Sequence, residues 1–264
     1  MIGKTNGEFN LTPKIVSWGG GTIQEISKML DAHYKGRIDI SDYWAVGDSR
    51  TENISEIPSG TTSETQSAQS IELVIIGMNH DDLATPVNGI SKAAITVQTK
   101  ECLKTSGYMT SAMGGASHAL WSNTERRVWC NNEFINALTT LRGLVKPVVK
   151  LTNRYADGNY SSDRQQETTE DYVFLLSQWE VWGMEQMNGA VYYVLPADGT
   201  QYEYMKTESN RIKSINGGAF KWWTRTSFIY KDGRIYTILV VDTGEFSDGY
   251  TARNTFGLAP AFCL

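Results

Sequence analysis

The chain closes on the stretch "NTFGLAPAFCL" (residues 254–264), which is apolar over most of its length. The ends of soluble domains are usually poorly ordered and polar, yet large apolar side chains occupy four of the last nine positions: Phe256, Leu258, Phe262 and Leu264. Such a terminus is stable only when it is tied into the core, typically as a strand of a sheet. Pro260 has no backbone N–H, so it should lie at an edge or a bulge. The stretch therefore predicts a closing β-strand.

The composition is that of a folded globular protein. The 264 residues are 41% hydrophobic and 20% charged, with a formal net charge of −5. An acidic chain does not favour binding to a nucleic-acid backbone, which normally requires a basic face. No run approaches the ~20 apolar residues of a membrane span. We therefore expect no nucleic-acid partner and no insertion into a membrane.

The first residues and the cysteines indicate in which compartment the protein is made. The opening "MIGKTNGEFNLTPK" (1–14) has no apolar region of the kind that secretory signals carry. We expect synthesis in the cytoplasm without a signal peptide, and exit from the cell only by another route such as lysis. Cys102, Cys130 and Cys263 are widely spaced and form neither a zinc pattern nor a disulfide framework. They are interpreted as buried thiols.

Two stretches predict amphipathic helices, residues 22–36 and 122–145. Thr22 with Glu25, and Ser122 with Glu125, have the spacing of capping boxes. The polar segments 51–70 and 152–170 predict long exposed loops.

Short apolar or alternating runs bounded by turn residues predict strands at 71–79, 92–98, 172–177, 190–195, 201–206, 220–230, 234–242 and 257–264. This pattern is typical of an α+β fold with an antiparallel sheet of short strands, two amphipathic helices and long irregular loops. No repeat and no linker divides the chain. Residues 18–264 are expected to form one domain, and residues 1–17 a tether or an edge strand.

Seven stretches together resemble an uncharacterised family of domains of unknown function that recur in phage tail and tail-fibre proteins and in bacterial surface proteins. They are "DYWAVGDSR" (42–50), "ELVIIGMNHDD" (72–82), "AAITVQTKECL" (93–103), "RRVWCNNEF" (126–134), "VFLLSQWEVWG" (173–183), "WWTRTS" (222–227) and "GLAPAFCL" (257–264). Their order and spacing match from about Trp18 to Leu264.

The last two stretches also resemble the end of C-type-lectin-like domains. These include formylglycine-generating-enzyme-like domains and the variable proteins of diversity-generating retroelements, which often close on Gly-x-Arg-Pro-Ala-Phe. The resemblance implies a C-type-lectin-like fold in which the terminal strands lie together and irregular loops present a ligand face. Ala259 stands where that motif has arginine, and Cys263 has no cysteine near it in sequence. Copper-dependent oxidase chemistry is therefore not implied.

Two polar clusters are candidates for metal binding or an ion pair. The sequence "NHDD" (79–82) offers an imidazole and two carboxylates, which could begin a metal site or simply cap a strand-ending turn. A metal site needs three or more convergent ligands, so the turn is favoured and no metal or cofactor is predicted. Asp48 and Arg50 could form a catalytic couple or a structural ion pair, and the ion pair is favoured.

Signals for catalysis are few. The chain has no G-x-S-x-G, P-loop or H-E-x-x-H motif. A nucleophile would have to use His80 or His118 with a partner that the sequence does not identify. Glu180 and Glu185, each close to a tryptophan, could act as the paired carboxylates of a glycosidase. A glycoside-processing enzyme, or a degenerate formylglycine-generating-like enzyme, is the alternative function.

The segment "TGEFSDGYTARN" (243–254) favours binding instead. It places aromatic and short polar residues on a loop held by strands, as in recognition surfaces, although a solvated hairpin loop would have a similar composition. The candidate ligand-binding residues are Tyr230, Tyr236, Glu245, Phe246, Ser247, Asp248, Tyr250, Arg253 and Asn254.

We therefore expect a non-enzymatic module that binds a receptor or ligand, on a phage tail or another extracellular surface. The expected partners are a host surface glycan or protein and other tail proteins, and a homo-oligomer is left open. A purely structural virion component is a third interpretation.

Overall fold

Two sheets form the framework of the computed structural model, which describes residues 13–60, 62, 64–112, 120–156, 162, 164–184 and 196–264. In spatial order, the five-stranded sheet contains β1 (Ser49–Ile54), β2 (Gln69–Met78), β5 (Ile95–Thr99), β14 (Ala261–Cys263) and β8 (Val173–Phe174). The seven-stranded sheet contains β13 (Phe246–Ser247), β12 (Ile235–Val240), β11 (Trp222–Ile229), β6 (Val148–Ala156), β3 (Asp82–Val87) and β4 (Ile90–Lys92), with β7 (Gln165–Asp171) also paired to β6. A small hairpin is made by β9 (Lys213–Ile215) and β10 (Gly218–Phe220).

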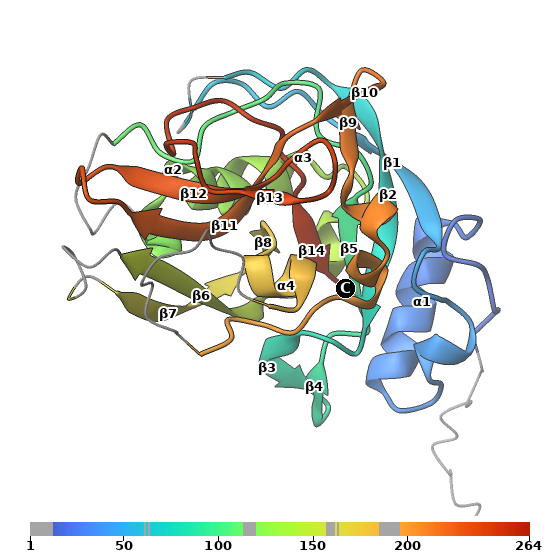
Figure 1. The fold of residues 1–264 in the computed structure, drawn as a ribbon. Helices are drawn as coiled ribbons and strands as arrows, with labels where there is room; N and C mark the ends of the chain where they lie inside the picture. The colour runs from blue at the N-terminus through green and yellow to red at the C-terminus, as the bar shows by residue number, and fades with distance from the viewer. Residues whose placement is uncertain are drawn as a thin grey trace, which may run out of the picture.

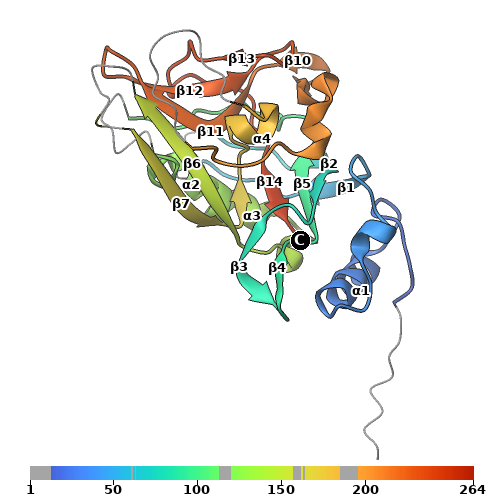
Figure 2. The same ribbon diagram turned by 60° about the horizontal axis from the view of Figure 1, so that its bottom comes forward.

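The described helices are short apart from α1. They are α1 (Ile23–Tyr34), α2 (Glu125–Trp129), α3 (Ile135–Ala137) and α4 (Gln178–Trp182). Figures 1 and 2 show α1 at one side of the molecule, next to β1 and β2, with the larger sheet on the opposite side. The predicted mixture of few helices and mostly sheet is confirmed. Among the strands of the described residues, β11 and β6 pair in parallel and the other pairs are antiparallel. An isolated parallel bridge also joins Trp222 to Gly257.

The predicted closing strand is confirmed as β14. It pairs antiparallel with β5 on one side and β8 on the other, and every residue from Leu258 to Leu264 is buried. Pro260 directly precedes the strand, and its carbonyl accepts a hydrogen bond from the N–H of Thr99 at 3.0 Å. The chain thus ends in the middle of the fold, as Figure 1 shows.

The first predicted helix is also confirmed. Thr22 and Glu25 form the expected capping box, and the helix buries Ile26, Met29 and Leu30. Residues 13–17 form no strand, so of the two interpretations of the N-terminal segment, the edge strand is wrong for these residues; residues 1–12 lie outside the described part of the chain.

The second predicted helix is wrong in its length and its cap. The region divides into α2, a π-helical turn (Cys130–Phe134) and α3. Thr124 caps α2 by accepting from the N–H of Arg127 at 3.1 Å. Glu125 binds the N–H and hydroxyl of Ser111 instead of closing a capping box with Ser122. Ser111, which is distant in sequence, therefore binds the carboxylate of Glu125 that the local pattern assigned to the capping box.

The two predicted polar loops are partly strand. Residues 51–70 contain the last four residues of β1 and the first two of β2, and the described residues between them belong to no strand, as predicted. Residues 152–170 contain the end of β6 and most of β7. Their polar side chains are partly buried and paired across the sheet, which a composition count does not reveal. The strand predicted at 201–206 is a turn of 3-10 helix at Glu203–Lys206, and the one at 190–195 lies outside the described residues.

The burial of β14 predicts the cost of weakening it. Phe262→Ala removes a fully buried ring between β5 and β8, and we expect a loss of ~3–5 kcal/mol in the free energy of unfolding. Tyr172→Ala is the matched control, because that aromatic residue is 44% exposed. Denaturant unfolding of the two variants measures the difference, and equal midpoints would contradict the role assigned to β14. Deletion of residues 258–264 is expected to abolish cooperative unfolding.

Candidate functional site

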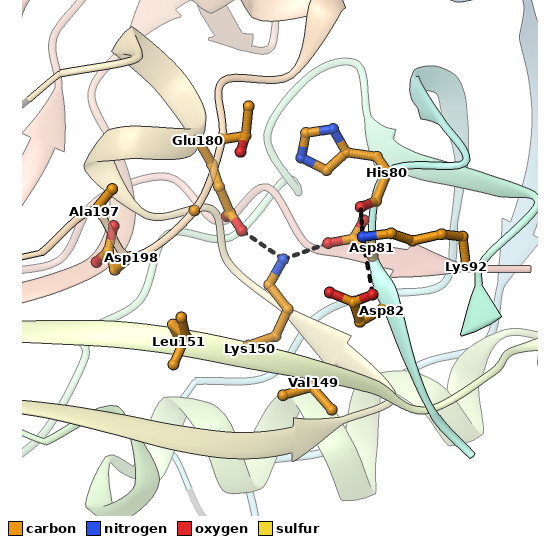
Figure 3. A pocket seen from close by; sticks show the side chains of 12 residues that line it. His80, Asp81, Asp82, Lys92, Val149, Lys150, Leu151, Glu180, Ala197 and Asp198 are labelled. Carbon is orange, nitrogen blue, oxygen red and sulfur yellow. Dashed lines mark hydrogen bonds and ion pairs between the residues drawn. The ribbon is translucent and has the colours of Figure 1, made fainter. Parts of the chain in front are cut away.

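A cleft of about 450 Å³ opens beside the larger sheet, and we name it the central cleft. Its described walls are His80, Asp81, Asp82, Lys92, Val149, Lys150, Leu151, Glu180, Ala197, Asp198, Gly199 and Thr200. Figure 3 shows Lys150 reaching up from β6 between the carboxylates of Glu180 and Asp81. Alternation along β6 explains the position: Lys150 and Thr152 face inward, and Leu151 between them faces solvent.

Four buried charged residues next to this cleft form an ionic network, consisting of Asp81, Lys150, Glu180 and Arg225. The ammonium of Lys150 lies 2.6 Å from Asp81 Oδ1 and 2.5 Å from Glu180 Oε1. Arg225, at the centre of β11, donates to Glu180 Oε2 at 2.5 Å and to Oε1 at 3.1 Å. Buried charges are stable only when they are paired and hydrogen-bonded, and here the partners come from the β2–β3 turn, β6, α4 and β11.

The network is held by further hydrogen bonds. The guanidinium of Arg225 also donates to the carbonyls of Leu151 and Leu175 and to the hydroxyl of Thr152. The hydroxyl of Tyr202 donates to Asp81 at 2.9 Å, and the hydroxyl of Thr96 donates to the same carboxylate. The donors and acceptors at this site are therefore closely matched.

Two glycines allow the backbone to approach the network. A Cβ on Gly199 would lie 2.7 Å from Glu180 Cγ, and a Cβ on Gly77 would lie 2.9 Å from the ring of Tyr202. Any larger residue at either position would push these side chains away from their partners.

The pairing keeps the network ionised. Burial acts to raise the pKa of Asp81 and of Glu180, but the neighbouring cations outweigh it and both pKa values are lowered. Burial acts to lower the pKa of Lys150, and its two carboxylate partners reverse the effect. Asp198 behaves differently, because burial dominates and its pKa is raised despite the nearby Arg225.

The "NHDD" segment contributes to this cleft, but its side chains diverge. Asp81 points inward to the network, whereas Asp82 makes an exposed ion pair with Lys92 at 2.9 Å. The imidazole of His80 stacks on Tyr202 with ring centroids 4.1 Å apart. The turn is confirmed by the positive φ of Asn79, and within the described residues no group of three or more His, Cys, Asp or Glu could hold a metal ion.

The other candidates for chemistry are placed as follows. Glu180 is committed to Arg225 and Lys150, and its lowered pKa does not suit a general acid. Glu185 and His118 lie outside the described residues. The three cysteines are buried free thiols, as expected.

The predicted pair of Asp48 and Arg50 is wrong: Asp48 accepts from the N–H of Ala45, and Arg50 donates to the carbonyls of Trp18 and Gly21.

The predicted ligand-binding residues do not form one surface. Tyr236 pairs with Thr251 near the start of β12, whereas Phe246 pairs with Val240 at its other end. At ~3.3 Å per residue, these positions are about 13 Å apart. Glu245, Phe246 and Ser247 belong to the second position, and Asp248 follows them in the connecting segment.

A second cleft, of about 380 Å³, lies at the first of these positions, and we name it the C-terminal cleft. Its described walls are Ala112, Arg234, Ile235, Thr251, Arg253 and Asn254. Tyr236 lies beside it through its pairing with Thr251, and Tyr230 packs edge-on against Tyr236 at 5.8 Å. The structure thus brings together Tyr230, Tyr236, Arg253 and Asn254 of the predicted set.

Two predicted anchors instead have structural roles. The ring of Phe246 packs against Trp182 at 6.4 Å, and the ring of Tyr250 packs against Phe256 at 4.9 Å. The hydroxyl of Tyr250 also accepts from Lys221 at 2.6 Å. Both rings are partly buried against the core, so alanine at either position should reduce stability as well as any binding.

Sequence reasoning missed the network. Lys150 and Arg225 are charged residues inside strands that are otherwise mostly uncharged, and Tyr202, Glu180 and Asp198 come from separate segments. A charge within a buried strand requires a buried partner. These two charges were therefore the feature of the sequence from which a buried ionic network could have been predicted.

Removing the central cation should destabilise the fold. Lys150→Met leaves Asp81 with no cation in contact, and we expect a loss of ~3–5 kcal/mol in the free energy of unfolding. Lys92→Met is the control, because its ion pair with Asp82 is exposed and such pairs contribute ~1 kcal/mol or less. Comparable denaturation midpoints for the two variants would contradict the importance of the network.

The raised pKa of Asp198 predicts a pH dependence. A carboxyl whose folded pKa lies above its unfolded value of ~3.9 favours folding at low pH, and this contribution is lost as pH rises through the folded pKa. The charged groups that act on it are Arg225 and Glu180. Asp198→Asn stays neutral, so its melting temperature minus that of the wild type should become more positive from pH 4 to pH 8. A flat or falling difference in calorimetric scans would contradict this.

Comparison with known proteins adds a family. No curated protein and no solved structure matches the chain significantly. Within the described residues no helix is both long and apolar enough to cross a membrane. Residues 90–264 match the model of a family described as "Domain of unknown function (DUF6273)", which is about two thirds of the chain. The chain belongs to this family.

Proposed function

We propose that the protein is a non-enzymatic recognition domain that binds its ligand in the C-terminal cleft. The proposal includes the finer description of the fold as C-type-lectin-like, for which the support is the resemblance of residues 222–227 and 257–264 to the end of such domains. It is also consistent with the closing strand paired on both sides within a sheet and with the irregular segment from residue 241 to residue 257.

The observation that carries the proposal is the position of two exposed arginines in one cleft. Arg234 and Arg253 both line it, and Arg253 makes no ion pair within the described residues. The carboxylate nearest to Arg234 is Asp232, at 3.8 Å and exposed to solvent. A guanidinium is a rigid fork of five donors that matches carboxylates and other paired oxygen acceptors.

Hydrogen bonds hold the segment under the cleft to the neighbouring strand. The N–H of Ala252 donates to the carbonyl of Ile235 at 3.0 Å, and the hydroxyl of Thr251 donates to the side chain of Asn254 at 2.9 Å. Loops that are fixed to strands in this way can vary in side chain without loss of the fold. The volume, about 380 Å³, lies within the range of small-ligand sites.

In this proposal the ligand is a glycan or protein on a host cell surface, and the protein is part of a phage tail or another extracellular structure with other tail proteins as neighbours. The support is the sequence resemblance to domains found in such proteins. An oligomer would multiply weak contacts through avidity.

The test pairs a binding variant with a matched arginine elsewhere. Arg253→Ala is expected to reduce binding of the labelled protein to bacterial cells and to a glycan array by ~10-fold or more, the usual effect of removing an arginine hot spot. Arg37→Ala, at an exposed position after α1, should bind as the wild type does. Both variants should melt at the wild-type temperature.

Three results would count against the proposal. They are an absence of binding by the wild type to cells and glycans, equal binding by Arg253→Ala, and a loss of binding that follows a loss of fold. Trp222→Ala and Trp223→Ala serve as folding controls, because both rings are fully buried.

A further inference from the structure

The central cleft is a second candidate binding site, and it shares no described wall residue with the C-terminal cleft. Its walls come from the β2–β3 turn, the ends of β3 and β4, β6, α4 and the segment 197–200. Every charged side chain of these walls, together with Arg225 behind Glu180, can be assigned to a partner except one.

The charges do not balance. Asp82 pairs with Lys92, Asp81 with Lys150, and Glu180 with Arg225. Asp198 is the fourth carboxylate, and no fourth cation lines the described part of the cleft. The site therefore carries one negative charge in excess when all its groups are ionised.

Asp198, the carboxylate in excess, also has an oxygen that can accept a further hydrogen bond. The oxygens of Glu180 already accept from Lys150, from Arg225 twice and from the N–H of Ser177. Asp198 is 1% exposed, and its Oδ2 accepts from the N–H of Asn153 at 3.0 Å. The hydroxyl of Ser177 lies near enough to lower the pKa of this carboxyl, but no donor meets Oδ1 with the geometry of a hydrogen bond. A buried carboxylate oxygen without a donor is costly unless a ligand supplies one.

We propose that the central cleft binds a small organic monocation, whose primary ammonium group donates a hydrogen bond to Oδ1 of Asp198. One positive charge balances the excess carboxylate, and the N–H groups satisfy the free oxygen. The cleft volume of about 450 Å³ has room for an organic group beyond the ammonium. The imidazole of His80, stacked on Tyr202, forms part of the wall that this group would contact.

A divalent metal fits these residues poorly. Calcium requires six to eight oxygen ligands and zinc usually four, whereas Asp198 offers one free oxygen and the other carboxylates are engaged by cations. A neutral alcohol could donate to the same oxygen, but it would leave the excess charge uncompensated. Charge therefore separates the proposed ligand from its neutral isostere.

The first experiment compares n-butylammonium with n-butanol on the wild-type protein. Binding is followed by the NMR signal of the His80 ring, which is assigned with His80→Gln and is one of three histidines in the chain. Phosphate buffer at constant ionic strength is used, because Tris is itself a primary amine. We expect a saturable shift with butylammonium and none with butanol over the same concentrations.

The second experiment removes the acceptor charge. Asp198→Asn keeps the shape of the side chain, and we expect it to weaken butylammonium binding ~10- to 100-fold, as for the loss of a hydrogen bond to a charged group. Asp82→Asn removes a carboxylate from the exposed rim of the same cleft, and its dissociation constant should change less than ~3-fold.

Two outcomes would overturn the proposal: equal saturation by butylammonium and butanol, or equal butylammonium affinity in Asp198→Asn and the wild type. If Asp198→Asn does not fold, the comparison of the two probes on the wild type decides alone. Failure here leaves the proposed recognition function untouched, since that function depends on Arg253 in the other cleft.

Discussion

The fold depends on the insertion of β14 between β5 and β8. Three residues of strand join the N-terminal half of the smaller sheet to the segment that continues into α4. The carbonyl of Leu264 also accepts the hydroxyl of Tyr34 at 2.9 Å, which ties α1 to the same strand. Because each buried apolar side chain contributes ~1.5–3 kcal/mol, this short segment carries a large share of the stability of a marginally stable fold.

The closing strand also touches the ionic network. The thiol of Cys263 lies 3.3 Å from the hydroxyl of Thr96 and 3.5 Å from Asp81 Oδ2. Apolar burial at the terminus therefore helps to exclude water from Asp81, which strengthens its attraction to Lys150. The pairing of Asp81 with Lys150 next to the central cleft therefore depends on these dry surroundings.

The region that matches the family model begins between β2 and β5, two strands that pair in the smaller sheet. The matched region, residues 90–264, contains β5 and β14, but the other neighbour of β5 is β2 at Gln69–Met78. A strand without that neighbour would present an unpaired edge. The structural unit of this chain therefore extends towards the N-terminus beyond the matched region, and includes α1 through the contact of Tyr34 with Leu264. The two clefts differ in their relation to the matched region. The walls of the central cleft include residues before position 90 as well as residues after it, whereas the described walls of the C-terminal cleft all lie within the matched region.

Local patterns in the sequence determined the closing strand, the first helix with its capping box, the buried strand at 71–79 and the burial of the thiols. These features depend on neighbours within a few residues or on simple apolarity, which the sequence displays directly. The ends of β1 and β7 were misread because paired polar strands have the composition of loops. Only the tertiary structure decided that Lys150 meets Glu180, that Phe246 lies far from Tyr236, and that Asp198 has a free oxygen. Each of these depends on contacts between residues distant in sequence, and the energy of a buried charge is set by its partners and not by its own identity.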